Sequence, residues 1–148
     1  MKKNQTIVAV LFACGAVAAS TSLAQVSVTN AWVRATVPNQ QATGAFMQLV
    51  SKKDTTLVSA RSDIAGVVEV HEMKMENDVM RMRAVDGLKL PANQLVELKS
   101  GGYHLMMMDL KKQLKVGTEA QITLVFKNAK GDSETTFVHA PVALTQPK

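Results

Sequence analysis

Short runs of β-branched and apolar residues, separated by turn-forming residues, constrain the fold of this 148-residue chain more than any other feature. The breaks contain Asn, Asp, Gly and Pro, and they recur at the spacing typical of an antiparallel sandwich or barrel. Beyond the N-terminal segment, no stretch keeps apolar residues at i, i+3, i+4 and i+7 for long. The expected strands cover residues 26–36, 45–50, 56–61, 67–75, 79–85, 94–98, 103–109, 120–127 and 133–138. These runs predict an all-β fold in a single domain.

Residues 1–24 have the pattern of a secretory signal peptide, which is removed on export. Lys2 and Lys3 give a positive start, an apolar run follows over residues 7–19, and small residues precede the expected cleavage point. The run is too short for a comfortable membrane span, and nothing later in the chain is apolar enough to span. We therefore expect a periplasmic protein whose mature domain covers residues 25–148 and is not inserted in the membrane.

Lipidation at Cys14 is an alternative fate for the N-terminal segment, because residues 11–14 loosely resemble a lipobox. Cys14 is the only cysteine, so the chain has no disulfide scaffold, no Cys-based zinc finger and no iron–sulfur cluster.

Loss of Lys2 and Lys3 on cleavage lowers the formal net charge from +5 to +3. No basic cluster with interleaved aromatic residues indicates a nucleic-acid partner.

Methionine is abundant, with 9 residues, whereas aromatic side chains make up only 4% of the chain. A thioether-rich composition indicates either flexible core filling or binding of a soft metal ion. A methionine stripe alone is more often core filling, and we assign that role to Met47 and Met107. Trp32 is expected to anchor the core, and His139 is expected to be an ordinary residue. The metal hypothesis depends on methionines that share a face with the other two histidines.

The most informative segment is the predicted hairpin over residues 67–85. If Asn77-Asp78 forms a two-residue turn, Met73 lies directly opposite Met82, and His71 lies opposite Ala84. His71 and Met82 are then diagonal neighbours on one face, with backbones roughly 7–8 Å apart, and their side chains can converge on one ion. A slip of one residue in the register would separate them. The predicted face carries His71, Met73, Met75, Met80, Met82 and Ala84.

A second His–Met pair follows Gly101-Gly102. In a strand, His104 and Met106 project from the same face, while Leu105 between them points the other way and suits a core. One imidazole and one thioether therefore project together, as in the predicted hairpin.

Two imidazoles and two thioethers favour a soft or borderline ion, and Cu(I) is the best match. Thioethers are poor ligands for Mg²⁺, Ca²⁺ and Zn²⁺, which favour oxygen, or nitrogen and thiolate. The candidate ligands of one Cu(I) per chain are His71, Met82, His104 and Met106. Met73 is placed to join or shield this site.

The spacing of these four residues resembles the H-x10-M-x21-H-x-M signature of the PCuAC family of periplasmic copper chaperones. The resemblance covers nearly the whole mature region. It implies a cupredoxin-like Greek-key β-sandwich or barrel that holds Cu(I) at His71, Met82, His104 and Met106. Residues 142–148 lack the His and Met of the tail that some members carry, so a single site is expected. The surrounding matches are residues 30–34, 43–47, 71–73, 79–83 and 101–106.

The same resemblance implies a non-enzymatic metallochaperone that delivers copper to the copper A centre of cytochrome c oxidase. The expected partners are oxidase subunit II and a Sco-type thiol protein, and the mature chain is expected to be a monomer. Copper sequestration for resistance is the closest alternative. An electron-transfer cupredoxin is disfavoured because blue-copper sites use a His₂Cys arrangement. An enzyme is disfavoured because no nucleophile–base pair or carboxylate pair is evident, and a metal-free interaction domain with a Met-rich core remains open.

Overall fold

The computed structural model describes residues 25–148, so the expected signal peptide and the alternative lipidation at Cys14 lie outside the described residues. Residues 25–148 form ten strands and no helix, which confirms the all-β prediction. Within this range no helix has the length and apolarity needed to cross a bilayer. The strands are β1 (Val26–Arg34), β2 (Ala42–Ser51), β3 (Thr55–Ser62), β4 (Ala65–Glu76), β5 (Val79–Ala84), β6 (Leu88–Leu90), β7 (Leu95–Leu98), β8 (Tyr103–Leu110), β9 (Glu119–Asn128) and β10 (Ser133–Ala143).

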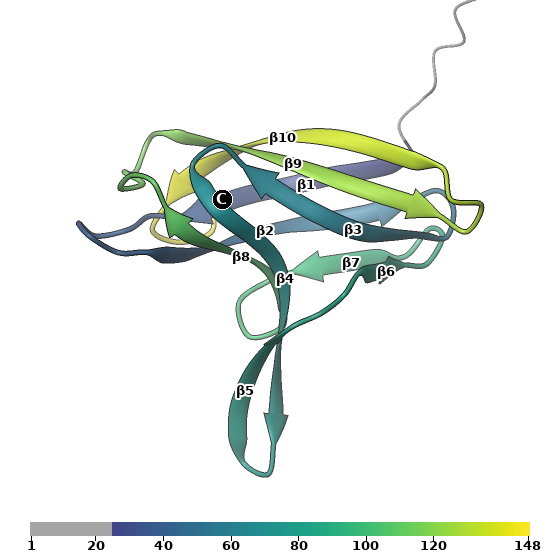
Figure 1. Ribbon diagram of the computed structural model, residues 1–148, viewed down its shortest axis with the longest axis horizontal. Helices are drawn as coiled ribbons and strands as arrows, with labels where there is room; N and C mark the ends of the chain where they lie inside the picture. Colours follow the sequence, from purple (N-terminus) through teal and green to yellow (C-terminus); the bar gives the residue numbers. More distant parts are fainter. Residues whose placement is uncertain (1–24) are drawn as a thin grey trace, which may run out of the picture.

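The strands form one hydrogen-bonded sheet that curls around the core (Figure 1). Their order is β5-β4-β8-β2-β1-β10-β9-β3-β6, and β7 pairs with the part of β2 that follows its β8 pairing. All pairs between named strands are antiparallel except β1 with β10. Strands that are distant in sequence, such as β2 and β8, are therefore neighbours in space. This non-local pairing is what brings the candidate ligands together.

Alternating side chains of the strands fill the interior. Met47 of β2 and Met107 of β8 lie in the hydrophobic core, as predicted. Leu105, which is also on β8, belongs to the same core. Trp32 is buried at 6% exposure but lies outside this core cluster. It is the cross-strand partner of Phe46, and the two rings pack with centroids 4.7 Å apart. The expectation that Trp32 is a buried anchor is confirmed, although Trp32 packs against Phe46, whereas the adjacent Val33 belongs to the main core cluster.

Strand bounds differ most from the prediction at β10. The expected strand ended at residue 138, but β10 continues through Pro141 to Ala143 and pairs in parallel with the end of β1. Pro141 occupies the last pair of the β9–β10 ladder, a position where a strand tolerates a residue without an N–H. Short β6 had no counterpart in the prediction, since three residues are too few to show a period.

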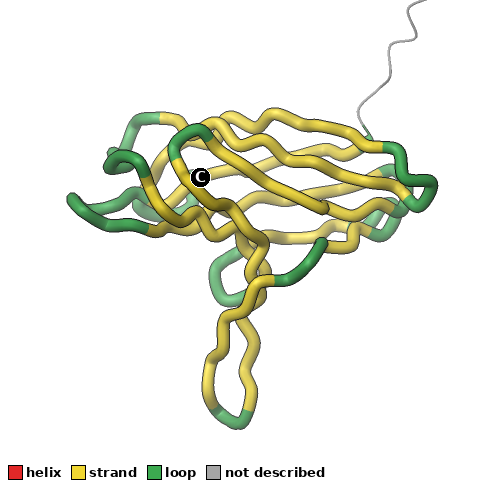
Figure 2. Tube along the Cα trace, viewed as in Figure 1, coloured by secondary structure: helices red, strands yellow, loops and turns green. Residues whose placement is uncertain are grey.

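The β4–β5 hairpin projects from the body of the domain, as both traces show (Figures 1 and 2). Asn77 and Asp78 have φ values of 51° and 62°, and positive φ at both central residues is the mark of a type I′ turn. Met73 pairs with Met82, and His71 pairs with Ala84. The predicted turn and register are confirmed.

Candidate metal site

Strand β8 brings the two His–Met pairs into one place. In the β4–β8 ladder His71 is the direct partner of His104, and Glu69 is the partner of Met106. The two imidazole centroids are 6.0 Å apart, with an angle of 59° between the ring planes. Directly opposed residues of an antiparallel pair project from the same face. One sheet face therefore carries both imidazoles.

The thioethers gather beside His104. A cavity of about 250 Å³ is lined by His104 and Met106 of β8 together with Met73 and Met82 of the hairpin. Three of the four predicted ligands thus line one cavity, along with the candidate auxiliary Met73. His71 is not part of the cavity lining. It lies beside the cavity residues because it is the direct cross-strand partner of His104.

The hydrogen bond of His104 selects the nitrogen that remains free. Its Nδ1 lies 3.1 Å from the carbonyl oxygen of Gly102. A carbonyl oxygen only accepts, so Nδ1 carries the proton and donates, and the lone pair is on Nε2. Backbone partners of this kind fix the orientation and the tautomer of metal-binding histidines.

His71 is held through the other ring nitrogen, Nε2. Its Nε2 lies 2.9 Å from Oε2 of Glu69, which is two residues earlier on the same strand face. Nδ1 of His71 is buried and has no hydrogen-bond partner among the described residues. A buried polar atom without a partner is costly unless a ligand satisfies it. Each imidazole therefore has one nitrogen held by the protein and one left to bind an ion.

Burial decreases across the site from β8 to the hairpin. His104 is 6% exposed, the side chain of His71 is 13% exposed, and Met82 is 46% exposed. The imidazole side is therefore enclosed, whereas the Met82 side is accessible to another protein.

The wall of the cavity beside Met106 depends on a glycine. Gly44 of β2 is the direct partner of Met106, and a Cβ at Gly44 would lie 2.7 Å from the tip of the Phe46 ring. The Phe46 ring therefore occupies the space over Gly44. The guanidinium carbon of Arg34 lies 5.2 Å from the centroid of that ring, a cation–π distance. This packing closes one side of the Met106 position.

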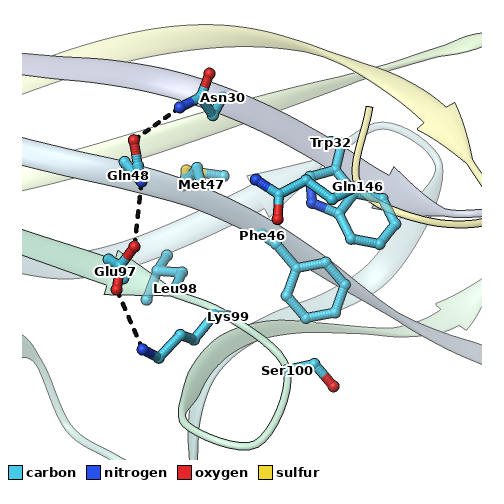
Figure 3. A pocket seen from close by; sticks show the side chains of 10 residues that line it. All are labelled: Asn30, Trp32, Phe46, Met47, Gln48, Glu97, Leu98, Lys99, Ser100 and Gln146. Atoms are coloured by element: carbon cyan, nitrogen blue, oxygen red, sulfur yellow. Dashed lines mark hydrogen bonds and ion pairs between the residues drawn. The ribbon is translucent and has the colours of Figure 1, made fainter. Parts of the chain in front are cut away.

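A second hollow, of about 260 Å³, is also lined by Phe46 (Figure 3). Its wall is a polar chain in which Asn30 donates to Gln48 (2.7 Å), Gln48 donates to Glu97 (3.1 Å), and Lys99 binds Glu97 (3.1 Å). The hydrogen bond from Lys99, with help from Gln48, lowers the pKa of the Glu97 carboxyl below its usual value. This hollow has no imidazole, so we do not assign the metal chemistry to it.

Within residues 25–148 no group of three or more His, Cys, Asp or Glu side chains is arranged to hold a metal ion. The other side chains with donor atoms suited to a soft ion that line the cavity with His104 are Met73, Met82 and Met106. His139 is exposed on β10 and pairs with Gln121, away from the β4–β8 face, in line with the ordinary role expected of it.

Comparison with known sequences identifies the family. The family model described as "Putative lipoprotein LpqE-like" matches residues 26–142. The chain belongs to the LpqE-like family. "Putative lipoprotein Lxx21020" of Leifsonia xyli subsp. xyli is 31% identical over 118 residues, which cover 79% of this chain and 69% of that protein. "Uncharacterized protein RP573" of Rickettsia prowazekii is 30% identical over 122 residues, covering 78% of this chain and 65% of the relative.

Solved structures of PCuAC domains share the fold of this LpqE-like chain. The copper-bound PCuAC domain from PmoF2 is 24% identical, with a TM-score of 0.64 over 82% of this chain and 94% of that one. The solution structure of CuI-DR1885 from Deinococcus radiodurans is 31% identical, with a TM-score of 0.62 over 84% of this chain and 82% of the other. The expected relationship to the PCuAC family and its cupredoxin-like β fold is confirmed.

Proposed function

We propose that this LpqE-like chain binds one Cu(I) ion through His71, Met82, His104 and Met106 and delivers it to a copper acceptor outside the cytoplasm. The observation that carries the proposal is the direct pairing of His71 with His104, each with one ring nitrogen held by the protein and one left free. The similarity to the copper-bound PCuAC domain from PmoF2 and to CuI-DR1885 supports the choice of ion.

The donor set fits a monovalent soft ion. Thioether and neutral imidazole donors carry no charge and release no proton on binding, and Cu(I) accepts both. Carboxylates are not among the proposed ligands, since Glu69 already accepts a hydrogen bond from His71. Thioethers also cannot form disulfides, which suits an oxidising compartment.

Delivery follows from the uneven burial of the ligands. Met82 is exposed on the hairpin, so a donor atom of the acceptor can replace its thioether first, while His104 remains enclosed. Exchange of one ligand at a time keeps the ion bound throughout. We infer export from the signal-peptide pattern of residues 1–24 and from the lipoprotein names of the family and of the Leifsonia xyli relative, and the mature domain then covers residues 25–148.

The acceptor that we propose is the copper A centre in subunit II of cytochrome c oxidase, with a Sco-type thiol protein as a second partner in delivery. The mature chain acts as a monomer without catalytic activity. These assignments rest on the resemblance to the PCuAC signature.

An anaerobic competition titration against a Cu(I) chelator, followed by incubation with an apo oxidase copper domain, tests the function. We expect one Cu(I) per chain, no intense blue band on addition of Cu(II), and transfer to the oxidase domain. Retention of the copper against that acceptor would favour sequestration. A blue cupredoxin spectrum, or failure to bind Cu(I), would overturn the proposal.

A further inference from the structure

Beyond the four proposed ligands, the hairpin carries a second pair of thioethers. Met75 of β4 and Met80 of β5 are direct cross-strand partners, and they are 58% and 47% exposed. The next pair on the same face is Met73 with Met82, which reaches the cavity beside His104. Four thioethers therefore form two successive rungs that run from near the hairpin tip to the candidate site.

The outer rung has no packing role in the fold. The hairpin projects from the body, and neither Met75 nor Met80 belongs to the hydrophobic core (Figure 2). The other hairpin face is held by ion pairs: Arg83 lies 3.4 Å from Glu72 and 3.6 Å from Glu76. Two exposed thioethers that are paired across the hairpin are accessible donors for a soft ion.

We propose that Met75 and Met80 form an outer station that captures Cu(I) and passes it through Met73 and Met82 to the enclosed site. This inference rests on the proposed function of the inner site. It concerns two residues that are not among the proposed ligands, and it gives the projecting hairpin a function in uptake.

The geometry suits stepwise ligand exchange. Successive same-face residues of a strand are about 7 Å apart, so neighbouring rungs are within reach of two flexible methionine side chains. In each step a bond from copper to the sulfur of Met75 or Met80 breaks as a bond to the sulfur of Met73 or Met82 forms. No proton or electron moves, because every donor is a neutral thioether. Two thioethers alone bind weakly, and the added imidazoles draw the ion inward.

The station can be detected directly by following methionine methyl groups by NMR during titration with Ag(I), a soft monovalent ion that does not change oxidation state. The protein used is the His104→Ala, Met106→Leu variant, which lacks half of the inner site. We expect the Met75 and Met80 methyl signals to shift together, while those of buried Met47 and Met107 stay in place. Unshifted Met75 and Met80 signals at saturating Ag(I) would overturn the proposal.

Uptake kinetics test the role of the station in the otherwise unaltered protein. The Met75→Leu, Met80→Leu variant keeps the apolar surface but removes both sulfur atoms. We expect Cu(I) uptake from a chelated donor to be several-fold slower while the equilibrium affinity is unchanged. Met108→Leu is the matched control, because Met108 lies on β8 and outside the hairpin, and it should leave uptake unchanged.

The outcomes separate the station from the inner site. Equal uptake rates for the Met75→Leu, Met80→Leu variant and the unaltered protein would show that any role of this surface is apolar docking, and the station would be rejected. Undiminished Cu(I) affinity of the His104→Ala, Met106→Leu variant would instead reject the inner site, whatever the Met75 and Met80 signals do.

Discussion

His71 and His104 are direct partners across the β4–β8 ladder, and the centroids of their rings are 6.0 Å apart. One imidazole is held through Nε2 by Glu69, and the other is held through Nδ1 by the carbonyl of Gly102. The pair therefore presents Nδ1 from one strand and Nε2 from the next.

Replacement of His104 by Ala is expected to weaken Cu(I) binding by more than about 100-fold, which exceeds the usual effect of residues that only orient a ligand. The imidazole is buried, so its loss removes a donor that solvent and neighbouring residues do not replace. Chelator competition measures the affinity. His139→Ala is the control, because His139 is an exposed residue of β10, and this variant should bind as the unaltered protein does. Equal affinities for the two variants would reject the site.

Replacement of Glu69 by Ala is expected to weaken Cu(I) binding by about 10-fold, the size typical of a lost partner behind a metal-binding histidine. The carboxylate accepts the Nε2 proton of His71, which leaves Nδ1 as the free nitrogen. The thermal midpoint of the metal-free protein should change little, because Glu69 is exposed. An unchanged affinity would mean that this hydrogen bond does not orient His71 for copper.

Met106→Leu and Met108→Leu form a matched pair on the same face of β8. Both changes keep an apolar side chain of similar size, and only Met106 lines the cavity. We expect a strong loss of Cu(I) affinity for Met106→Leu and almost none for Met108→Leu. Similar losses in both variants, measured by chelator competition, would point to a packing effect instead of a lost ligand.

Exchange of Met82 and Arg83 tests the strand register of the hairpin. The double variant keeps the composition but moves the thioether to the face that carries the ion pairs, since successive side chains alternate. We expect its Cu(I) affinity to fall to that of Met82→Leu. Arg83→Met alone loses the same ion pairs but keeps Met82 in place, so it should bind almost normally. Normal binding by the exchanged variant would contradict the role of Met82.

Gly44→Ala is expected to lower the free energy of unfolding by about 1–3 kcal/mol, the usual range for overpacking. The added Cβ would lie 2.7 Å from the Phe46 ring, which must shift. A chemical denaturation curve of the metal-free protein gives the change. Phe46→Leu in the same background should recover part of the loss, and no recovery would show that the ring is not the source of the strain.

Local sequence patterns were sufficient for the all-β class and for the β4–β5 hairpin. Asn77-Asp78 fixed the turn, and the period of two placed His71 and Met82 on one face, because both depend only on residues close in the chain. The core role of Met107 followed from alternation with His104 and Met106, and that of Met47 from the general tendency of methionine to fill cores. Trp32 is buried as expected, but its packing against Phe46 depends on the pairing of β1 with β2, which is not a local property of the chain.

The assembly of one site from two His–Met pairs needed the tertiary structure. The sequence determined four donors of the right chemistry, arranged as two pairs that each share a strand face. Only the antiparallel pairing of β4 with β8 placed His71 opposite His104, and only the pairing of β2 with β8 placed Gly44 opposite Met106. Turn chemistry and side-chain alternation are local, whereas the choice of strand neighbours depends on how all the apolar faces are buried together.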